Sequence, residues 1–277
     1  MKVRSPAVAA GHYPLLMGVV NLTPDSFSDG GDYNDVGAAF DRIETLIADG
    51  ADIIDLGAES TRPGASQVPA EEEWKRLEPL LKRLSQSSLP VSISVDTRKP
   101  SLMLQAADYG ATWFNDIGGH ADITDLATLA SYPEMHYIAM HMPITPDIMQ
   151  VQPMPAAQAL ADIKEFFAQR MTLLAAAGFG GERVWLDPGI GFGKTDAANV
   201  RIMQEISLWS QTMQIMIGVS RKSLIGRILD ITDPKARDAP SKMLEFGLAL
   251  CGAKLIRTHN VAPLKRLFDL VRGDSDG

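Results

Sequence analysis

Eight short apolar runs recur along the chain, and each is bounded by polar residues or glycine. Several are nearly continuous in Val, Ile, Leu and Met, as expected for parallel strands that are covered on both faces. Segments of helical character separate them, including 36–50, 70–84, 156–178 and 241–252. This alternation predicts an α/β fold, with a (β/α)8 TIM barrel as the leading architecture and an open doubly wound sheet as the alternative. The eight runs are 15–21, 51–57, 91–96, 112–118, 136–142, 183–189, 214–220 and 253–259.

The length of 277 residues suits one large barrel domain of roughly 250 residues. No linker or low-complexity stretch marks a second domain. We therefore expect an N-terminal extension over 1–14, a single barrel domain over 15–272 and a frayed tail over 273–277.

Charge and composition restrict the partners. The net charge is −8, and an acidic surface argues against nucleic acid because phosphate binding needs clustered Lys and Arg. No apolar run reaches the roughly 18 residues of a membrane span, and the first residues make a poor signal peptide. The single cysteine, Cys251, cannot form an intrachain disulfide, which fits a reducing compartment. We expect a cytoplasmic protein with no membrane partner.

Polar side chains gather at the carboxyl ends of the predicted strands. In a barrel these ends converge on one face, where active sites form. Eight strands that deliver carboxylates, amides and cations to one rim predict a binding site there. These residues are Asn21, Asp55, Glu59, Asp96, Asn115, Asp116, His141, Asp187, Arg257, His259 and the segment 220–223.

The mixture of side chains indicates the chemistry of the ligand. Asp96, Asn115 and Asp187 supply hydrogen-bond acceptors and donors but no nucleophile, which suits a flat heterocycle with amino and amide edges. Lys222 and Arg257, with His259, supply positive charge on the other side. A polar heterocycle attached to an anion is therefore the inferred ligand.

The loops add groups that bind anions. The segment 59–65 leaves Thr61 and Arg62 free to meet an anion, and 220–223 lies at a predicted helix start, where carboxylates and phosphates bind readily. The glycine-rich segment 187–194 lacks the spacing of a P-loop. Zinc-ligand spacing and serine-hydrolase motifs are also missing from the sequence.

Seven separated motifs closely resemble dihydropteroate synthase of folate biosynthesis. They are MGVVNLTPDSFSDGG (17–31), GAESTRPGA (57–65), SVDT (94–97), NDI (115–117), LDPGIGFGK (186–194), SRKS (220–223) and RTH (257–259), in this order. The resemblance runs from about residue 15 to about residue 270. It implies a (β/α)8 barrel that joins 6-hydroxymethyl-7,8-dihydropterin diphosphate to p-aminobenzoate. It also implies Mg²⁺ as cofactor, a homodimer and inhibition by sulfonamides.

The resemblance also implies a role for individual residues. The pterin would contact Asp96, Asn115, Met142, Asp187, Lys222 and Arg257, and the diphosphate would contact Asn21, Thr61, Arg62, Arg257 and His259. The p-aminobenzoate would contact Phe27, Arg62, Pro63, Phe192, Lys222 and Ser223. Asn21 and Asp29 would serve Mg²⁺, with Asp25 contributing to the metal or to closing the loop. The catalytic set would be Asn21, Asp96, Lys222, Arg257 and His259.

Three segments depart from the family pattern. The chain has HMPI at 141–144 where HMQG is common, and RTHN at 257–260 where R-x-H-D is usual. Pro240 stands near the expected start of the eighth barrel helix, where a Gly-Thr step is usual. Two rivals follow: a non-catalytic pterin-binding duplicate, motivated by these departures, and a pterin-dependent methyltransferase domain. The second does not need the NLTPDSFSDGG, STRPG and SRKS segments that are present here.

Overall fold

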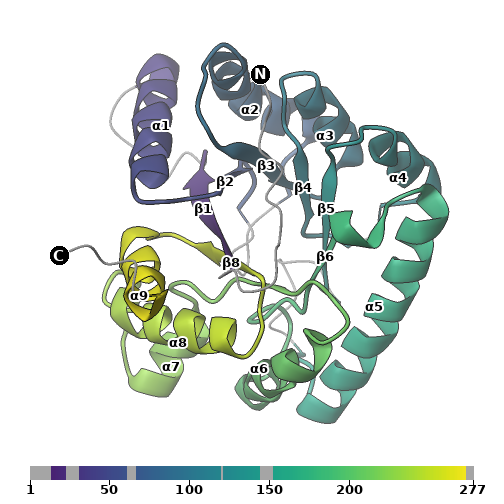
Figure 1. Cartoon of the computed structure of the whole chain (residues 1–277), viewed down its shortest axis with the longest axis vertical. Helices are drawn as coiled ribbons and strands as arrows, with labels where there is room; N and C mark the ends of the chain where they lie inside the picture. Colours follow the sequence, from purple (N-terminus) through teal and green to yellow (C-terminus); the bar gives the residue numbers. More distant parts are fainter. Residues whose placement is uncertain (1–13, 23–30, 61–66, 120, 144–151, 273–277) are drawn as a thin grey trace.

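The computed structural model describes residues 14–22, 31–60, 67–119, 121–143 and 152–272, and it forms a ring of helices around a parallel sheet (Figure 1). The sheet has eight strands in the order β6-β5-β4-β3-β2-β1-β8-β7. A single parallel bridge between Leu186 and Ile215 joins the two edges and closes the barrel. The (β/α)8 prediction is therefore confirmed. The strands are β1 (Leu15–Asn21), β2 (Ile53–Gly57), β3 (Ser92–Thr97), β4 (Trp113–Asp116), β5 (His136–Met140), β6 (Val184–Asp187), β7 (Met216–Ile217) and β8 (Leu255–Thr258).

The helices follow from local sequence signals. Asp122 caps the start of α4 by accepting from two backbone N–H groups, and Thr195 does the same for α6 with one. Gly178 ends α5 in the left-handed conformation, at φ 101°. The helices are α1 (Gly31–Ala48), α2 (Ala70–Ser85), α3 (Pro100–Ala107), α4 (Ile123–Ala130), α5 (Ala156–Ala177), α6 (Asp196–Trp209), α7 (Ser223–Leu229), α8 (Asp238–Leu250) and α9 (Ala262–Arg272), with a short 3-10 turn, η2 (Gly181–Arg183). None of the helices in these described segments is long and apolar enough to cross a bilayer.

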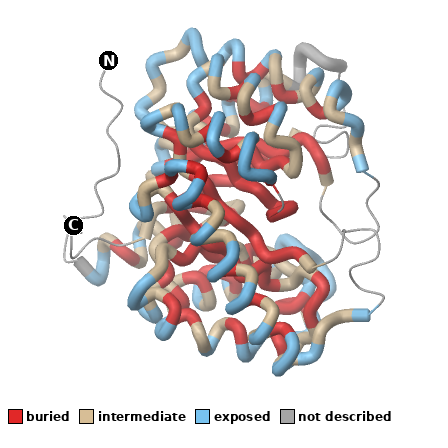
Figure 2. Tube along the Cα trace, turned by 90° about the vertical axis from the view of Figure 1, so that its right-hand side faces the viewer, coloured by how far each residue is buried: buried red, intermediate tan, exposed pale blue. Residues whose placement is uncertain are grey.

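Aromatic and aliphatic side chains fill the half of the barrel where the strands begin. Trp113 stacks on His136 with ring centroids 4.2 Å apart and lies 5.4 Å from Trp185. Replacing either indole by Ala would cost about 3–5 kcal/mol of stability. Most strand residues are buried, whereas the surrounding helices expose their outer faces (Figure 2). This interior layer consists of Met17, Ile53, Trp113, Ile138, Trp185, Met216 and Leu255. It closes one end of the barrel and leaves the other end for chemistry.

Aspartates end two of the strands. The Asp116 Oδ1 accepts from the backbone N–H groups of Gly118 and Gly119, so β4 stops there and not at 118. The Asp187 Oδ1 accepts from the Gly189 N–H at 2.7 Å and ends β6 in the same way. Such Asx turns replace the ladder hydrogen bonds with local ones.

The seventh strand is shorter than predicted. The apolar run 214–220 contributes only Met216 and Ile217 as a strand, with Ile215 forming the closing bridge. The chain leaves the sheet at Gly218, and Arg221 then takes a left-handed backbone conformation, at φ 58°. Hydrophobicity alone did not indicate where strand pairing stops.

Candidate active site

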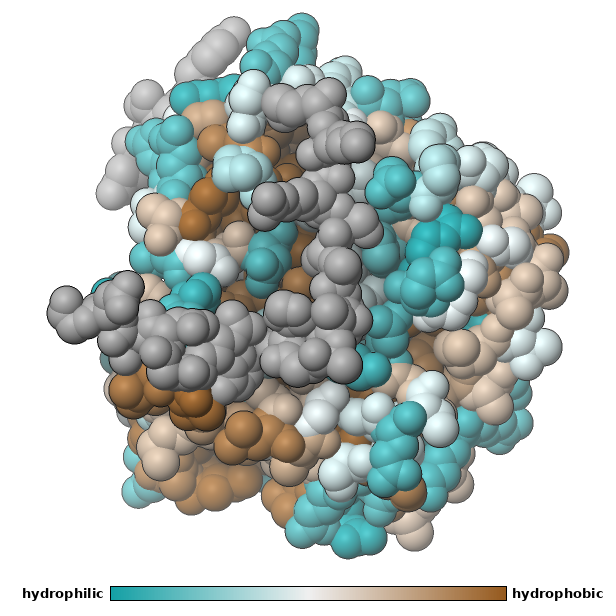
Figure 3. All heavy atoms as spheres, in the orientation of Figure 1, coloured by the Kyte–Doolittle hydropathy of each residue, from teal (hydrophilic) through white to brown (hydrophobic). Residues whose placement is uncertain are grey.

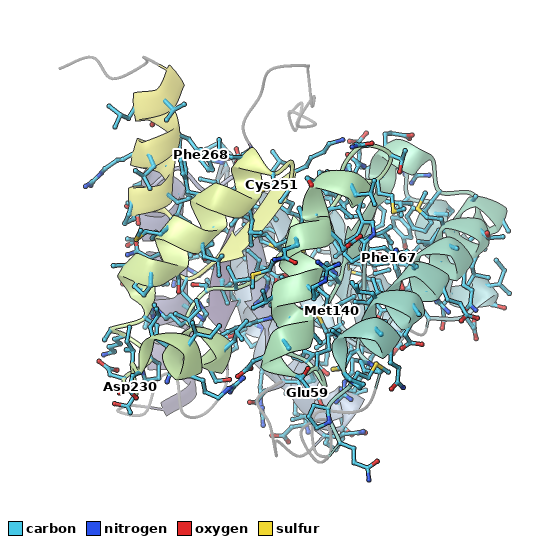
Figure 4. All side chains as sticks on the ribbon, turned by 90° about the horizontal axis from the view of Figure 1, so that it is seen from below. Glu59, Met140, Phe167, Asp230, Cys251 and Phe268 are labelled. Atoms are coloured by element: carbon cyan, nitrogen blue, oxygen red, sulfur yellow. The ribbon has the colours of Figure 1, made fainter. Side chains whose placement is uncertain are left out.

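Every second residue along the strands points into the barrel, and near the carboxyl ends these residues become polar. In β2 the interior side changes from Ile53 to Asp55, and in β4 it changes from Trp113 to Asn115. Asp187 and Arg257 make the same change in β6 and β8. The strand ends lie toward one end of the molecule, where Figure 4 labels Glu59; Cys251, just before β8, lies toward the opposite end.

Arg257 is the centre of the hydrogen-bond network in this polar layer. Its Nε donates to the Asp55 Oδ2 at 2.6 Å, and its Nη2 donates to the Asp96 Oδ2 at 2.6 Å. The Asn115 Nδ2 also donates to the Asp55 Oδ2, at 3.1 Å. Although burial acts to lower it, the two carboxylates raise the pKa of Arg257 above its ordinary value. Arg257 is thus a fixed cation that connects β2, β3 and β8.

Asp55 was predicted to lie at the rim as a strand-end carboxylate, but it was given no role toward a ligand. It is fully buried and touches two residues that were predicted. The signal that could have identified it is the period-two pattern, because Ile53, Asp55 and Gly57 share one side of β2.

Several buried polar atoms in this layer have no hydrogen-bond partner among the described residues. They are Asp55 Oδ1, Asp96 Oδ1, Asn115 Oδ1 and, one layer lower, Ser94 Oγ. Buried polar atoms are nearly always paired, so unpaired acceptors on neighbouring strands indicate a ligand that carries N–H donors. All four atoms belong to β2, β3 and β4.

Asp187 and Lys222 form the opposite wall. The Lys222 ammonium donates to the Ile190 carbonyl and lies 4.4 Å from the centroid of the Phe192 ring. Burial lowers the pKa of Lys222 to about 8, against the opposing charge of Asp187. Burial raises the pKa of Asp187, and the charge of Lys222 opposes that rise. The opposite charges of the two residues therefore favour each other's ionised form.

The carboxyl groups of the site outnumber its cations. Burial raises the pKa of Asp96 to about 7, Arg257 opposes this, and the charge of Asp55 adds to it. Three carboxyl groups, Asp55, Asp96 and Asp187, face two cations, Arg257 and Lys222. Such a site favours additional positive charge on a bound ligand.

An apolar wall adjoins the polar layer. Ile117, Met140 and Met142 are buried together, and Phe192 packs against them. Of the HMPI segment, Met142 keeps its apolar contact, whereas Ile144 lies outside the described residues. A flat ring whose edges bind the polar side chains and whose face contacts this apolar wall would be held in one orientation.

His259 is held by Ser220. The Ser220 Oγ accepts the His259 backbone N–H at 3.2 Å and lies 3.0 Å from the ring Nδ1. Burial, together with the charges of Arg257, Arg221 and Lys242, lowers the pKa of His259 to about 3. The imidazole is therefore neutral at pH 7, and it can donate a hydrogen bond but carries no charge.

Other predicted residues lie at the rim or outside the described segments. Asn21 ends β1, and a Cβ built on Gly57 would lie 3.6 Å from both the Asn21 Oδ1 and the Asp96 Oδ2. Ser223 is the exposed first residue of α7. His141 points away from the site, because its Nε2 lies 2.9 Å from the Asp162 Oδ2 of α5. The predictions for Asp25, Phe27, Asp29, Thr61, Arg62 and Pro63 fall outside the described residues.

Lys194 is buried, and the sequence assigned it no role once the P-loop spacing was found to be absent. Its Nζ donates to three backbone carbonyls, those of His141 at 3.2 Å, Gly189 at 2.9 Å and Phe192 at 3.0 Å. Burial lowers its pKa to about 7. These bonds fix the turn that follows Asp187 and so fix Phe192.

Asn260, the residue at which the RTHN segment departs from the family pattern, has a hydrogen-bond partner in α8. The Asn260 Nδ2 donates to the Asp238 Oδ2 of α8 at 2.8 Å. Pro240 lies in the first turn of the same helix, as predicted.

A barrel with this acidic and amide-lined rim has the features of a pterin-binding enzyme, and the family model described as "Pterin binding enzyme" matches residues 17–259. Dihydropteroate synthase of Neisseria meningitidis serogroup C is 38% identical over 90% of this chain and 88% of its own length. The chain belongs to the dihydropteroate synthase family.

Solved structures agree with this assignment. Dihydropteroate synthase of Yersinia pestis with a sulfonamide drug complex superimposes with a TM-score of 0.86 and 34% identity, over 99% of this chain and 98% of that one. The Xanthomonas albilineans enzyme with 4-aminobenzoic acid gives 0.85 and 34%, over 96% and 94%. The family expected from the sequence is confirmed.

Proposed function

We propose that the protein joins 6-hydroxymethyl-7,8-dihydropterin diphosphate to p-aminobenzoate and releases diphosphate and 7,8-dihydropteroate. The observation that carries this proposal is the set of unpaired buried acceptors Asp55 Oδ1, Asp96 Oδ1 and Asn115 Oδ1. A dihydropterin presents amino and ring N–H donors along one edge, which would satisfy such acceptors. The Xanthomonas neighbour bound to 4-aminobenzoic acid supports the second substrate.

Pterin recognition would use both walls of the site. The Asp187 carboxylate can accept from two adjacent N–H donors on one wall, and Asn115 offers an amide on the other. Lys222 would donate to the ring oxygen or a ring nitrogen. Met142 and Phe192 would cover the ring face, because they form the apolar wall.

The leaving diphosphate would be stabilised by donors on β8 and at the rim. Arg257 supplies charge, and neutral His259 supplies one N–H donor. Asn21, Thr61 and Arg62 would complete this subsite. The p-aminobenzoate would lie against Phe192, Lys222 and Ser223, with Phe27, Arg62 and Pro63 from the loops.

The residues present fit Mg²⁺ that is bound together with the diphosphate. Within the described residues, no group of three or more His, Cys, Asp or Glu side chains is placed to hold a metal. Mg²⁺ commonly takes one or two protein oxygens and completes its shell with substrate phosphates and water. Asn21 offers one such oxygen, and Asp29 is the second proposed ligand. When bound, the ion would neutralise charge on the departing diphosphate.

The chemistry is a substitution at the pterin methylene. The bond between this carbon and the diphosphate oxygen breaks, and the electron pair leaves with the diphosphate. Positive charge spreads into the pterin ring, where the excess of carboxyl groups stabilises it. The amine nitrogen of p-aminobenzoate then forms the new bond and releases a proton. The weak basicity of an arylamine leaves no need for a strong general base.

The exposed apolar side chains of α7 and α8 support a homodimer. Ile228 and Leu229 are 54% and 51% exposed, and Met243 and Leu250 are 77% and 64% exposed. Hydrophobic side chains gather over these helices at the lower left of Figure 3. Large exposed apolar patches mark contact surfaces. We further propose a cytoplasmic location, which the single cysteine supports.

Purified protein mixed with Mg²⁺, dihydropterin diphosphate and p-aminobenzoate tests the reaction. Diphosphate release and the mass of dihydropteroate are followed together, with each substrate omitted in turn. Product that requires both substrates is expected. Tight binding of the pterin diphosphate without product would instead indicate the non-catalytic duplicate.

A further inference from the structure

We propose that Asp238 and Asn260 form a clamp that holds Arg221 in a left-handed backbone conformation and so positions its two neighbours, Ser220 and Lys222. The inference rests on the proposed function, because those neighbours serve the diphosphate and pterin subsites. Asp238 and Asn260 are positioning residues that touch no substrate.

The backbone at Arg221 is strained. Its φ of 58° is unfavourable for any residue with a Cβ, and such conformations persist only when surrounding contacts enforce them. Three contacts do so here. The Arg221 N–H donates to the Ser241 Oγ at 3.0 Å, and its carbonyl accepts from the Arg237 Nη1 at 3.3 Å. Its side-chain Nε donates to the Asp238 Oδ1 at 2.8 Å.

The strained residue separates two functional contacts. On one side, the Ser220 Oγ lies 3.0 Å from the His259 Nδ1. On the other, Lys222 bonds to the Ile190 carbonyl beside the Phe192 ring. A right-handed or extended Arg221 would rotate one of these neighbours away from its partner, because φ sets the relative direction of successive residues.

Asn260 connects this turn to the end of β8. Its Nδ2 donates to the Asp238 Oδ2 at 2.8 Å, and it directly follows His259. Partial burial acts to raise the pKa of Asp238, but hydrogen bonds from Arg221 and Asn260 keep it below its ordinary value. The Asp238 carboxylate therefore receives one donor from the segment 220–223 and one from the residue that follows His259.

The bond between Asn260 and Asp238 has one donor and one acceptor, and paired substitutions can exchange these two roles. An aspartate at 260 would place two carboxylates where one donor and one acceptor now meet. An asparagine at 238 can accept from Arg221 with its oxygen and donate to an aspartate at 260 with its amide. The double substitution Asn260→Asp with Asp238→Asn therefore restores the same bonds in the opposite sense.

The experiment compares N260D, D238N, the double variant and D196N. Asp196 pairs with Arg227 at 2.6 Å on the exposed surface of α6 and α7, so D196N removes a carboxylate from a nearby arginine without touching the clamp. The readouts are kcat and KM for both substrates, the melting temperature, and hydrogen–deuterium exchange of the peptide 219–223 in the ligand-free protein.

We expect N260D and D238N to lower kcat/KM for the pterin diphosphate about 10- to 100-fold, since a misplacement of about 1 Å can cost about 100-fold. Exchange should rise at 219–223 and stay unchanged elsewhere. The double variant should recover both properties to within about threefold, and D196N should match the parent protein.

The clamp is refuted if N260D keeps normal kinetics and exchange, or if the double variant is as impaired as the single ones. A general loss of stability would lower the melting temperature and raise exchange across the barrel, which also contradicts it. If the parent protein makes no product, the proposed function fails, whereas the exchange measurement still decides the clamp.

Discussion

Replacing Asp55 by Asn tests whether the polar layer recognises the pterin. The Asp55 Oδ2 receives both the Arg257 Nε at 2.6 Å and the Asn115 Nδ2 at 3.1 Å, and its Oδ1 is buried without a partner. An amide that keeps its oxygen toward Arg257 must turn its NH₂ group to the place of the Oδ1. That donor would then face the donors of the ligand. The substitution therefore removes an acceptor for the ligand and also places a donor against the ligand's own donors.

The size of the effect follows from the bonds involved. A hydrogen bond to a charged group contributes about 1.5–3 kcal/mol, and each 1.4 kcal/mol is a factor of ten in affinity. We expect affinity for the pterin diphosphate to fall about 10- to 100-fold. The free energy of unfolding should fall little, because Arg257 keeps its hydrogen bond to Asp96. The substitution also removes the repulsion between Asp55 and Asp96, which adds to the effect of burial in raising the pKa of Asp96.

The assay is calorimetric titration of the pterin diphosphate without p-aminobenzoate, together with thermal unfolding. Asp52→Asn is the matched control. Asp52 directly precedes β2, and its Oδ2 accepts the Leu16 N–H at 2.8 Å. It should leave affinity unchanged. Affinity of the Asp55 variant within twofold of the parent protein, or an equal loss in the control, would refute the reasoning.

Three further predictions follow from the same geometry. Asp187→Asn should weaken pterin diphosphate binding about 10- to 100-fold by titration, because the amide NH₂ group cannot accept the second of two adjacent N–H donors, and unchanged affinity would contradict this. His259→Gln should reduce acid sensitivity. The folded protein keeps His259 neutral down to about pH 3, whereas the unfolded chain takes up the proton near 6.5, so stability falls as the pH decreases between these values. Urea unfolding at about pH 7 and pH 4 checks this, and identical losses in parent and variant would count against it. Met243→Asp combined with Leu250→Asp should convert a dimer into a monomer by light scattering, since charge opposes burial of an apolar contact; a persistent dimer would place the interface elsewhere.

The architecture could be predicted because strands and helices carry local signals. The apolar runs ended at Asp116 and Asp187 or shortly after, since aspartate both interrupts hydrophobicity and forms the turn that ends the strand. The seventh strand was overestimated because the run 214–220 stays apolar after it leaves the sheet. Pairing partners, and not hydrophobicity, decide where a strand ends.

The site could be predicted in its residue types but not in its pairings. Asp96, Asn115, Asp187 and Arg257 converge as expected from their places at strand ends. The bond from Arg257 to Asp55 joins residues 202 positions apart, and it depends on barrel closure. The triple carbonyl contact of Lys194 likewise exists only once the turn after β6 has formed.

The single bridge between Leu186 and Ile215 has a consequence for ligand binding. β5 and β6 are paired over four positions, whereas β6 meets the residue just before β7 in one bridge, so we expect the barrel to open most easily at this junction. Asp187 and Lys222 lie on its two sides. A ligand that contacts both would favour the closed barrel, and any fraction of the protein that is open would reduce the measured affinity. Substitutions that strengthen the junction without touching a substrate would therefore tighten binding without adding a contact.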